Sequence, residues 1–329
     1  PAPAPASVAR PAALWSAGAR ALRTMADAPS ANDIKNKIQR SKVKAVLKKE
    51  KAERKRKRRD EKKELGDDAP PAQVPRTLET MREFDETMVS PDDEEVAGEE
   101  AMDEYAEYFA GNSAPKLMIT TAKSPRPTKH TYDFIKDFME LFPTIYFYKR
   151  KGYEIKHICE IAASKGFTDL LVVSEDHKVV NGLWLIHLPG GPTAHFKLSS
   201  LKLSRDIKGH GNPTSHRPEL ILNNFNTRLG KRMGRMIASL FPLDPQFKGR
   251  RVVTCHNQRD FLFFRHHRYI FEEGKRKNDG PVRARLQELG PQFTLKLRSL
   301  QLGPFDPSAG EYEWYHKTEM DTSRRRFHL

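Results

Sequence analysis

The sequence predicts an α/β protein in which one mixed-sheet unit is used twice. Residues 191–203, GPTAHFKLSSLKL, return with seven identities as residues 290–302, GPQFTLKLRSLQL. An apolar strand, a polar loop and a helix ending in Leu-Phe-Pro occur in 115–143 and again in 218–242. A pair of apolar strands precedes each copy of the repeated segment. Two copies are too few for a solenoid, so we expect two packed α/β halves, about 115–207 and 216–305, within a domain spanning 115–305.

The repeated segment changes phase at the same place in both copies. Phe196 and Leu198 alternate on even positions, and the apolar positions then move to Leu201 and Leu203. The second copy makes the same one-residue change, after Leu297. Because a strand alternates its faces with a period of two, this slip predicts a β-bulge shared by both copies.

The segments before and after this domain differ in charge. The chain has 329 residues and a net charge of +15. Residues 1–65 hold 19 Lys/Arg against 7 Asp/Glu, whereas residues 66–114 hold 2 against 15. We therefore expect a leader at 1–33, a basic arm at 34–65, an acidic linker at 66–114 and a C-terminal extension at 306–329. Residues 1–24 precede Met25; we interpret them as upstream translated sequence rather than a transit peptide.

The basic arm is compatible with a helix but has few apolar residues to bury, so alone it should be solvated or disordered. Six consecutive basic residues within it predict a nuclear localisation signal, and the alternative is a merely solvated charged helix. These residues are Arg54, Lys55, Arg56, Lys57, Arg58 and Arg59. In the acidic linker, Met102, Tyr105, Ala106 and Phe109 have helical spacing. This spacing predicts a short amphipathic helix that docks on the basic body.

The first half begins with an apolar strand at 117–121. Ile135, Phe138 and Phe142 then mark a helix, and Ile155, Ile158, Cys159 and Ala162 mark a second helix that Gly166 closes. Two strands follow, at 169–173 and 183–188. Asn181-Gly182 predicts the hairpin turn between them.

The second half repeats this order with one omission. After the strand at 218–223, Leu229, Met233, Met236, Ile237 and Leu240 mark a helix. The counterpart of the second helix is missing, and a short polar stretch at 243–250 replaces it. Strands at 251–255 and 261–271 follow, and residues 272–286 are interpreted as a polar insertion before the repeated strand.

The most informative surface pattern lies on the helix of the second half. Arg228, Lys231, Arg232 and Arg235 occur at i, i+3, i+4 and i+7, with no acid among them. Like charges at this spacing disfavour an isolated helix, and a polyanion across them would reverse that effect. The helix start near Thr227 adds amides for one phosphate. The stripe therefore predicts contact with RNA or phosphate, and the alternative is an ordinary solvated face.

The second copy of the repeated strand carries Lys296 and Arg298 opposite Leu295 and Leu297, whereas the first copy has only Lys197 there. This asymmetry favours the second copy for binding, although a polar outward face is common in strands. No phosphate-binding glycine loop, metal-ligand spacing or nucleophile–base pair is found. His266 and His267 are adjacent in a strand, so they face opposite sides. We therefore expect no catalytic residues, no metal, no cofactor, no small-molecule substrate and no membrane partner.

Three stretches together resemble the Brix domain family of ribosome assembly factors. They are ILNNFNTRLGKRMGRMIASLFP at 221–242, HNQRDFLFFRHHRYIF at 256–271 and ELGPQFTLKLRSLQLGPF at 288–305. The resemblance implies a duplicated fold similar to anticodon-binding domains of class II tRNA synthetases. It also implies that residues 288–305, including Gly290 and Pro291, belong to a motif proposed to bind RNA.

The resemblance further implies a nucleolar, non-catalytic protein that binds pre-ribosomal RNA during large-subunit maturation. Family members commonly work with a dedicated protein partner and with other factors of the pre-60S particle. Three alternatives remain open: a small-subunit factor of the same family, an enzyme that modifies or cleaves RNA, and a scaffold whose basic face meets acidic proteins. The sequence does not identify the RNA site, the partner or the order of assembly.

Overall fold

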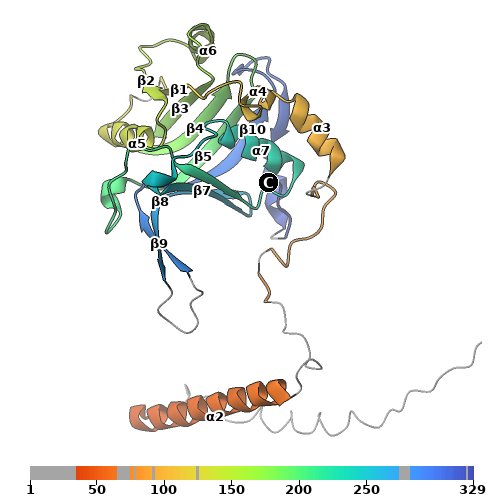
Figure 1. Cartoon of the computed structure of the whole chain (residues 1–329), viewed down its shortest axis with the longest axis vertical. Helices are drawn as coiled ribbons and strands as arrows, with labels where there is room; N and C mark the ends of the chain where they lie inside the picture. The colour runs from red at the N-terminus through yellow and green to blue at the C-terminus, as the bar shows by residue number, and fades with distance from the viewer. Residues whose placement is uncertain are drawn as a thin grey trace, which may run out of the picture. The chain divides into compact units, whose positions relative to one another are not determined.

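The structure, a computed structural model, describes residues 35–64, 75–77, 79–90, 93–123, 126–273, 282–323 and 325–329. The chain divides into two compact units, residues 1–75 and 76–329 (Figure 1). The expected leader at 1–33, including residues 1–24, lies outside the described residues. The second unit begins within the predicted acidic linker.

The described part of the first unit is one helix, α2 (Lys37–Glu64). Its apolar side chains are too few to form a buried stripe, and Ile38, Val46 and Leu47 are exposed. The six basic residues 54–59 all lie on this helix and are exposed. The arm is thus helical and solvated; its role in nuclear entry stays a prediction.

The second unit is built on one mixed sheet, shown in Figure 1. The strand order is β2 (Ile145–Phe147), β1 (Leu117–Thr121), β3 (Asp169–Asp176), β4 (Val179–His187), β5 (Thr193–Lys202), β10 (Gln292–Gln301), β8 (Phe261–Glu273), β7 (Arg251–Gln258) and β6 (Glu219–Asn223). Off this path, β9 (Val282–Glu288) pairs with β8, and β11 (Tyr312–Tyr315) pairs with β10.

The predicted duplication is confirmed by this topology. β1 pairs parallel with β3, as β6 does with β7, and antiparallel pairs β3–β4 and β7–β8 follow in each half. The helices α5 (Lys129–Met139) and α7 (Arg228–Ala238) follow β1 and β6 respectively. The repeated segment forms β5 and β10, which pair antiparallel with each other at the centre of the sheet. The doubled strand is therefore the seam between the halves.

The predicted bulges are present in both copies. Ser199 pairs with Thr294, and Lys202 pairs with Gln292. β5 therefore advances three residues where β10 advances two, so the extra residue lies on β5. Ser200 there adopts a positive φ of 52°. Further along, Leu297 pairs with Phe196, and Ser299 pairs with His195. β10 advances two residues where β5 advances one, so the extra residue there lies on β10. The bulges keep Leu201 partly buried and Leu300 fully buried after the slip.

Each repeated strand begins with a glycine that its surroundings require. Gly191 and Gly290 have φ of 94° and 81°. A Cβ on Gly191 would lie 2.3 Å from the backbone carbon of Gly303, and one on Gly290 would lie 2.7 Å from Cα of Ser204. Neither position can hold a side chain without moving backbone.

The two faces of the sheet are covered differently. α5 and α7 pack on the inner face of the two halves, where Phe134, Met233 and Phe293 belong to one continuous core. α6 (Ile155–Ser164) packs on the outer face of the first half only, over Leu170 and Ile186. Among the described residues, the second half has no counterpart of α6, as the sequence predicted.

The predicted turn at Asn181-Gly182 was wrong. The hairpin turns at His177 and Lys178, both with positive φ, and Asn181 and Gly182 lie inside β4. A Cβ on Gly182 would lie 2.2 Å from Oγ of Ser174 on the neighbouring strand, so a side chain there would force Ser174 to rotate. The glycine thus permits a close cross-strand approach.

The predicted helix through Met102, Tyr105, Ala106 and Phe109 is interrupted. α3 (Glu94–Met102) ends before Asp103, and the short α4 (Ala106–Phe109) follows. Met102 is 86% exposed, whereas Tyr105 is fully buried. The break rotates Tyr105 and Tyr108 inward, so the four residues do not form one face.

The predicted polar insertion at 272–286 was also wrong in part. β8 extends to Glu273, and β9 begins at Val282 and pairs with it from Glu273↔Val282 to His267↔Glu288. Charged residues obscured this strand because a two-stranded ribbon need not bury either face. The 306–329 extension belongs to the same unit, since Phe327 and Leu329 are buried.

Candidate nucleic-acid interface

The helix α7 presents its cationic stripe because its two ends and its apolar side are fixed. Thr227 caps the N-terminus: its Oγ1 accepts from the Gly230 amide at 2.8 Å and donates to the His328 carbonyl at 2.8 Å. Met233, Met236 and Ile237 are buried against the sheet. The four basic residues therefore lie away from the core.

These four side chains contact the acidic segment that contains α3 and α4. Arg228 lies 2.5 Å from Glu95 and 3.6 Å from Glu99, and Lys231 lies 4.0 Å from Glu100. Arg232 lies 3.3 Å from Glu104 and 2.8 Å from Glu313 of β11. The docking expected for this segment is thus present, and it falls on the stripe itself.

Arg235 makes the most enclosed of these contacts. Its guanidinium donates to both oxygens of Asp103, at 2.5 and 2.7 Å, and to the Glu100 carbonyl at 2.7 Å. It also lies 4.1 Å from the ring centre of Phe109. Only 14% of the Arg235 side chain and 10% of the Asp103 side chain are exposed. A bidentate, half-desolvated pair of this kind is stronger than a surface ion pair.

Two tyrosines anchor the acidic segment independently of its charges. The Tyr108 hydroxyl lies 2.6 Å from the Phe241 carbonyl and 2.9 Å from the Ala238 carbonyl, at the end of α7. Tyr105 is fully buried, and its ring centre lies 4.7 Å from that of His187. The four cations of the stripe are therefore paired with carboxylates of the same chain. Their contact with RNA stays a prediction.

The residues predicted on the second repeated strand divide into two groups. Gly290 and Pro291 are buried and shape the start of β10 rather than a contact surface. Lys296 lies on the outer face, 3.0 Å from Asp321 and 5.4 Å from the ring centre of Phe261. Arg298 lies at the bulge, 3.1 Å from Nδ1 of His316. The structure does not bring these residues together with the α7 stripe, which lies on the other face.

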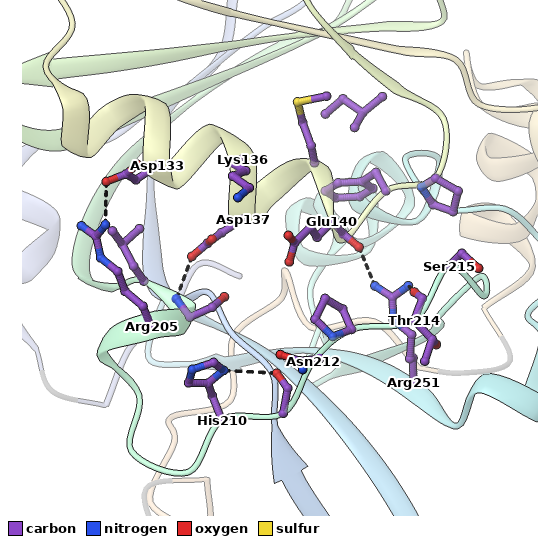
Figure 2. Close-up of a pocket in the computed structure, with 18 residues that line it drawn as sticks. Asp133, Lys136, Asp137, Glu140, Arg205, His210, Asn212, Thr214, Ser215 and Arg251 are labelled. Atoms are coloured by element: carbon purple, nitrogen blue, oxygen red, sulfur yellow. Dashed lines mark hydrogen bonds and ion pairs between the residues drawn. The ribbon is translucent and has the colours of Figure 1, made fainter.

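The equivalent helix of the first half faces the chain itself. Asp133 pairs with Arg205 at 2.8 Å, and the Ser204 amide donates to Asp137 at 2.7 Å. Figure 2 shows Asp133, Asp137 and Arg205 on the same side of the cavity. These contacts border a cavity of about 870 Å³ that also includes Lys136 and His210.

Arg251, at the back of the same cavity, joins the two halves (Figure 2). It is 2% exposed and donates to the Glu140 carbonyl at 2.6 Å and to the Thr214 and His216 carbonyls. Its Nε lies 3.2 Å from Nε2 of His266, whose Nδ1 lies 2.8 Å from the Gly290 carbonyl. Burial lowers the pKa of His266 to about 3, so the ring is neutral, accepts from arginine and donates to the carbonyl.

Within the described residues, no group of three or more His, Cys, Asp or Glu is placed to hold a metal ion. Cys159 and Cys255 are free and buried, and burial raises the pKa of their thiols to about 11 and about 12. No helix in the described ranges is long and apolar enough to cross a bilayer.

The sequence interpretation missed one arrangement, the outer row of β8. Phe261, Phe263, Arg265, His267 and Tyr269 alternate with the buried Leu262, Phe264 and His266. The signal that could have found this row is the alternation itself, in a strand whose outward positions are aromatic or basic instead of merely polar.

The duplicated sheet and its antiparallel seam define a two-half α/β domain. The family model described as the Brix domain matches residues 124–299, and the chain belongs to the Brix domain family. It is 52% identical to Ribosome production factor 1 of Mus musculus, over 91% of this chain and 85% of that protein. It is 44% identical to Ribosome production factor 1 of Saccharomyces cerevisiae, over 90% of this chain and 98% of that protein.

Among solved structures, it is similar to a probable ribosomal biogenesis protein from Aeropyrum pernix K1. The sequence identity is 15% and the TM-score is 0.41, covering 56% of this chain and 96% of that chain.

Proposed function

We propose that this chain is a non-catalytic assembly factor that binds pre-ribosomal RNA during maturation of the large ribosomal subunit. Its membership of the Brix domain family and its relatives named Ribosome production factor 1 make it a ribosome biogenesis factor. RNA binding, the large subunit, nucleolar location and a dedicated protein partner among pre-60S factors are the finer parts of the proposal.

One observation carries the RNA-binding part. The α7 stripe holds four cations with no acid on the same helix, and each lies within 4.0 Å of a carboxylate from another element. A surface that recruits closely spaced carboxylates has the charge and spacing to hold successive phosphates. Arginine, which supplies three of the four cations, suits phosphate because its planar fork donates two bonds at once.

The first prediction tests this proposal by ultraviolet crosslinking of the tagged full chain to RNA in cells, with the bound RNA sequenced. We expect reads concentrated in the large-subunit part of the precursor. Changing Arg228, Lys231, Arg232 and Arg235 to Gln should remove most of them, while the apolar side of α7 keeps the fold. The matched control changes Lys129, Lys136, Lys149 and Lys156 of the first half to Gln.

Three results would contradict parts of the proposal. Reads from the small-subunit precursor would overturn the assignment to the large subunit. Crosslinking at background level would overturn RNA binding. Equal losses in both variants would show that charge acts diffusely and that the stripe is not a site.

A further inference from the structure

Among the described residues, no α-helix packs on the outer face of the second half, whereas α6 covers the outer face of the first half. In the first half, α6 packs on Leu170 and Ile186, which pair across β3 and β4. The equivalent pair in the second half is Val252 of β7 and His267 of β8, and the next pair on the same face is Thr254 and Arg265. The helices described next to the second half pack on its inner face. Val252 is apolar and buried, but the other three positions hold polar or basic side chains in place of the apolar ones that lie beneath α6.

β8 carries a continuous row of side chains along this face. The row consists of Phe261, Phe263, Arg265, His267, Tyr269 and Phe271. Phe261 is 39% exposed and Phe271 is 62% exposed, while the alternate residues Leu262, Phe264 and His266 are buried. The ring centres of Tyr269 and Phe271 lie 5.2 Å apart, which places both on one side of the strand.

The spacing of the row suits an extended nucleic-acid strand. Side chains on one face of a strand recur every ~6.6 Å, twice the rise per residue. This is about twice the ~3.4 Å separation of stacked bases along one strand of a duplex. Bases that are unstacked from each other could each lie on one ring, and aromatic rings accept any base because every base has a flat π-face.

Cations flank the rings rather than forming a separate patch. The Arg265 guanidinium lies 5.8 Å from the Phe263 ring centre, and Lys296 lies 5.4 Å from that of Phe261. Lys197 of β5, paired with Lys296 across the seam, is exposed. Acids border the row: Tyr269 donates to Glu219, Asp321 pairs with Lys296, and Glu288 of β9 lies opposite His267. Interleaved rings and cations favour a polyanion with flat bases over an apolar protein surface.

We propose that the outer row of β8 is a stacking platform for single-stranded RNA. This inference rests on the proposed function and goes further by assigning the bases to the sheet and not to the α7 stripe. At the far end of the row, Leu286 of β9 lies opposite Tyr269 and makes that end more apolar. A protein partner on the row is therefore the outcome that the experiment must separate from RNA.

The second prediction tests the platform with the full chain and a labelled oligouridine of about 12 nucleotides, within the lengths that single-strand-binding folds cover. Changing Phe261 and Phe271 together to Ala should weaken binding by about tenfold or more, because each stacked base contributes ~1–3 kcal/mol and ~1.4 kcal/mol is tenfold. The slope of log affinity against log salt should not change, because no cation is removed.

The matched control changes Tyr146 and Tyr153, which are 50% and 52% exposed in the first half, to Ala. Unchanged binding in the β8 variant, or equal loss in both variants, overturns the platform. A wild-type chain that binds duplex RNA but not oligouridine also overturns it and leaves the proposed function standing. A chain that binds neither RNA overturns both. In cells, a photo-crosslinking residue at position 271 should label RNA, and labelling of a protein instead overturns the inference.

Discussion

At the scale of single residues, the most informative is Arg251, a buried cation whose hydrogen bonds run mainly to carbonyl oxygens. Burial lowers the pKa of Arg251, opposed by the charge of Glu140. Its bonds run to carbonyl oxygens, one of them from Glu140 at the C-terminus of α5, where the helix dipole is negative. The neutral ring of His266 accepts a further hydrogen bond, from Nε of Arg251. The network ties α5 of the first half, the segment between the halves, and the start of β10.

The third prediction concerns the pH dependence of folding through His266. The pKa is about 3 in the folded chain and ~6.5 when unfolded, so the unfolded state binds the proton first. The stability from His266 is therefore complete above ~6.5 and falls by up to ~1.4 kcal/mol per pH unit as the pH drops toward 3. His266→Gln can keep both hydrogen bonds without titrating.

This effect is measured by urea unfolding of the unchanged chain and of the His266→Gln variant at several pH values between about 7 and 5. As the pH falls, the free energy of unfolding should decrease less steeply in the Gln variant. His195, whose pKa burial and Arg298 lower to about 4, titrates in both proteins and cancels in the comparison. Parallel pH curves for the two proteins would contradict the assignment.

At the scale of elements, α7 and the acidic segment form one interface, the clamp, which combines ion pairs with the packing of buried side chains. The carboxylates meet the cationic stripe, while Val96, Tyr105 and Tyr108 are buried. Deleting the segment would remove these side chains, expose the apolar surface that they cover and disturb the fold. Removing the charges alone separates the electrostatic contact from the packing.

The fourth prediction uses that separation. Changing the acids of the clamp to their amides should tighten binding to random RNA, most at low salt where screening is weakest. The acids are Glu95, Glu99, Glu100, Asp103 and Glu104. Arg232 keeps its ion pair with Glu313, so the changes free the other three cations. If each of these then neutralises one phosphate, the salt slope should steepen by roughly two units, at ~0.7 per contact for a single strand. Adding the Gln changes at the four cations of α7 should cancel the gain.

The matched control neutralises five acids outside the clamp, each near a basic partner: Glu154, Glu160, Asp176, Asp206 and Asp244. It changes net charge equally but frees no α7 cation. An equal gain in RNA affinity from this control would show that net charge, and not the clamp, sets the affinity.

At the scale of the whole molecule, the chain repeats a fold and varies its surfaces. The seam of β5 and β10 and the inner core serve both halves in the same way. The outer face is covered by α6 in the first half and left to β8 in the second. The helix α5 carries both acidic and basic residues, whereas the charged residues of α7 are all basic. The duplication therefore supplies a scaffold, and the binding proposals all fall on the second half.

The fifth prediction concerns the arm in the intact chain. Replacing Arg54, Lys55, Arg56, Lys57, Arg58 and Arg59 with Ser should reduce nucleolar accumulation of a fluorescently tagged chain, because import receptors read basic runs. These residues are exposed on α2, so the change should leave the unfolding transition of residues 76–329 in place. A matched replacement of Lys37, Lys42, Lys44, Lys48, Lys49 and Lys51 on the same helix controls for charge. Unchanged nucleolar fluorescence in the first variant would refute the import role.

The sequence by itself determined the duplication, the order of the main strands and helices, and both bulges. These follow from local periodicity: Phe196 and Leu201 must both avoid water, and a strand can satisfy both only by adding a residue between them. Local periodicity also placed the basic residues of α7 on one stripe, since that needs only the helical repeat.

Only the tertiary structure decided what lies against those residues. That Gly182 sits in a strand depends on Ser174 of the next strand, and that Gly290 and Pro291 are buried depends on Ser204 and the seam. The pairing of Arg235 with Asp103 joins positions 132 residues apart, which no local pattern encodes. Burial and ion pairing are properties of surfaces that meet in space, and the same stripe can face water, carboxylates or phosphates until the fold brings a partner to it.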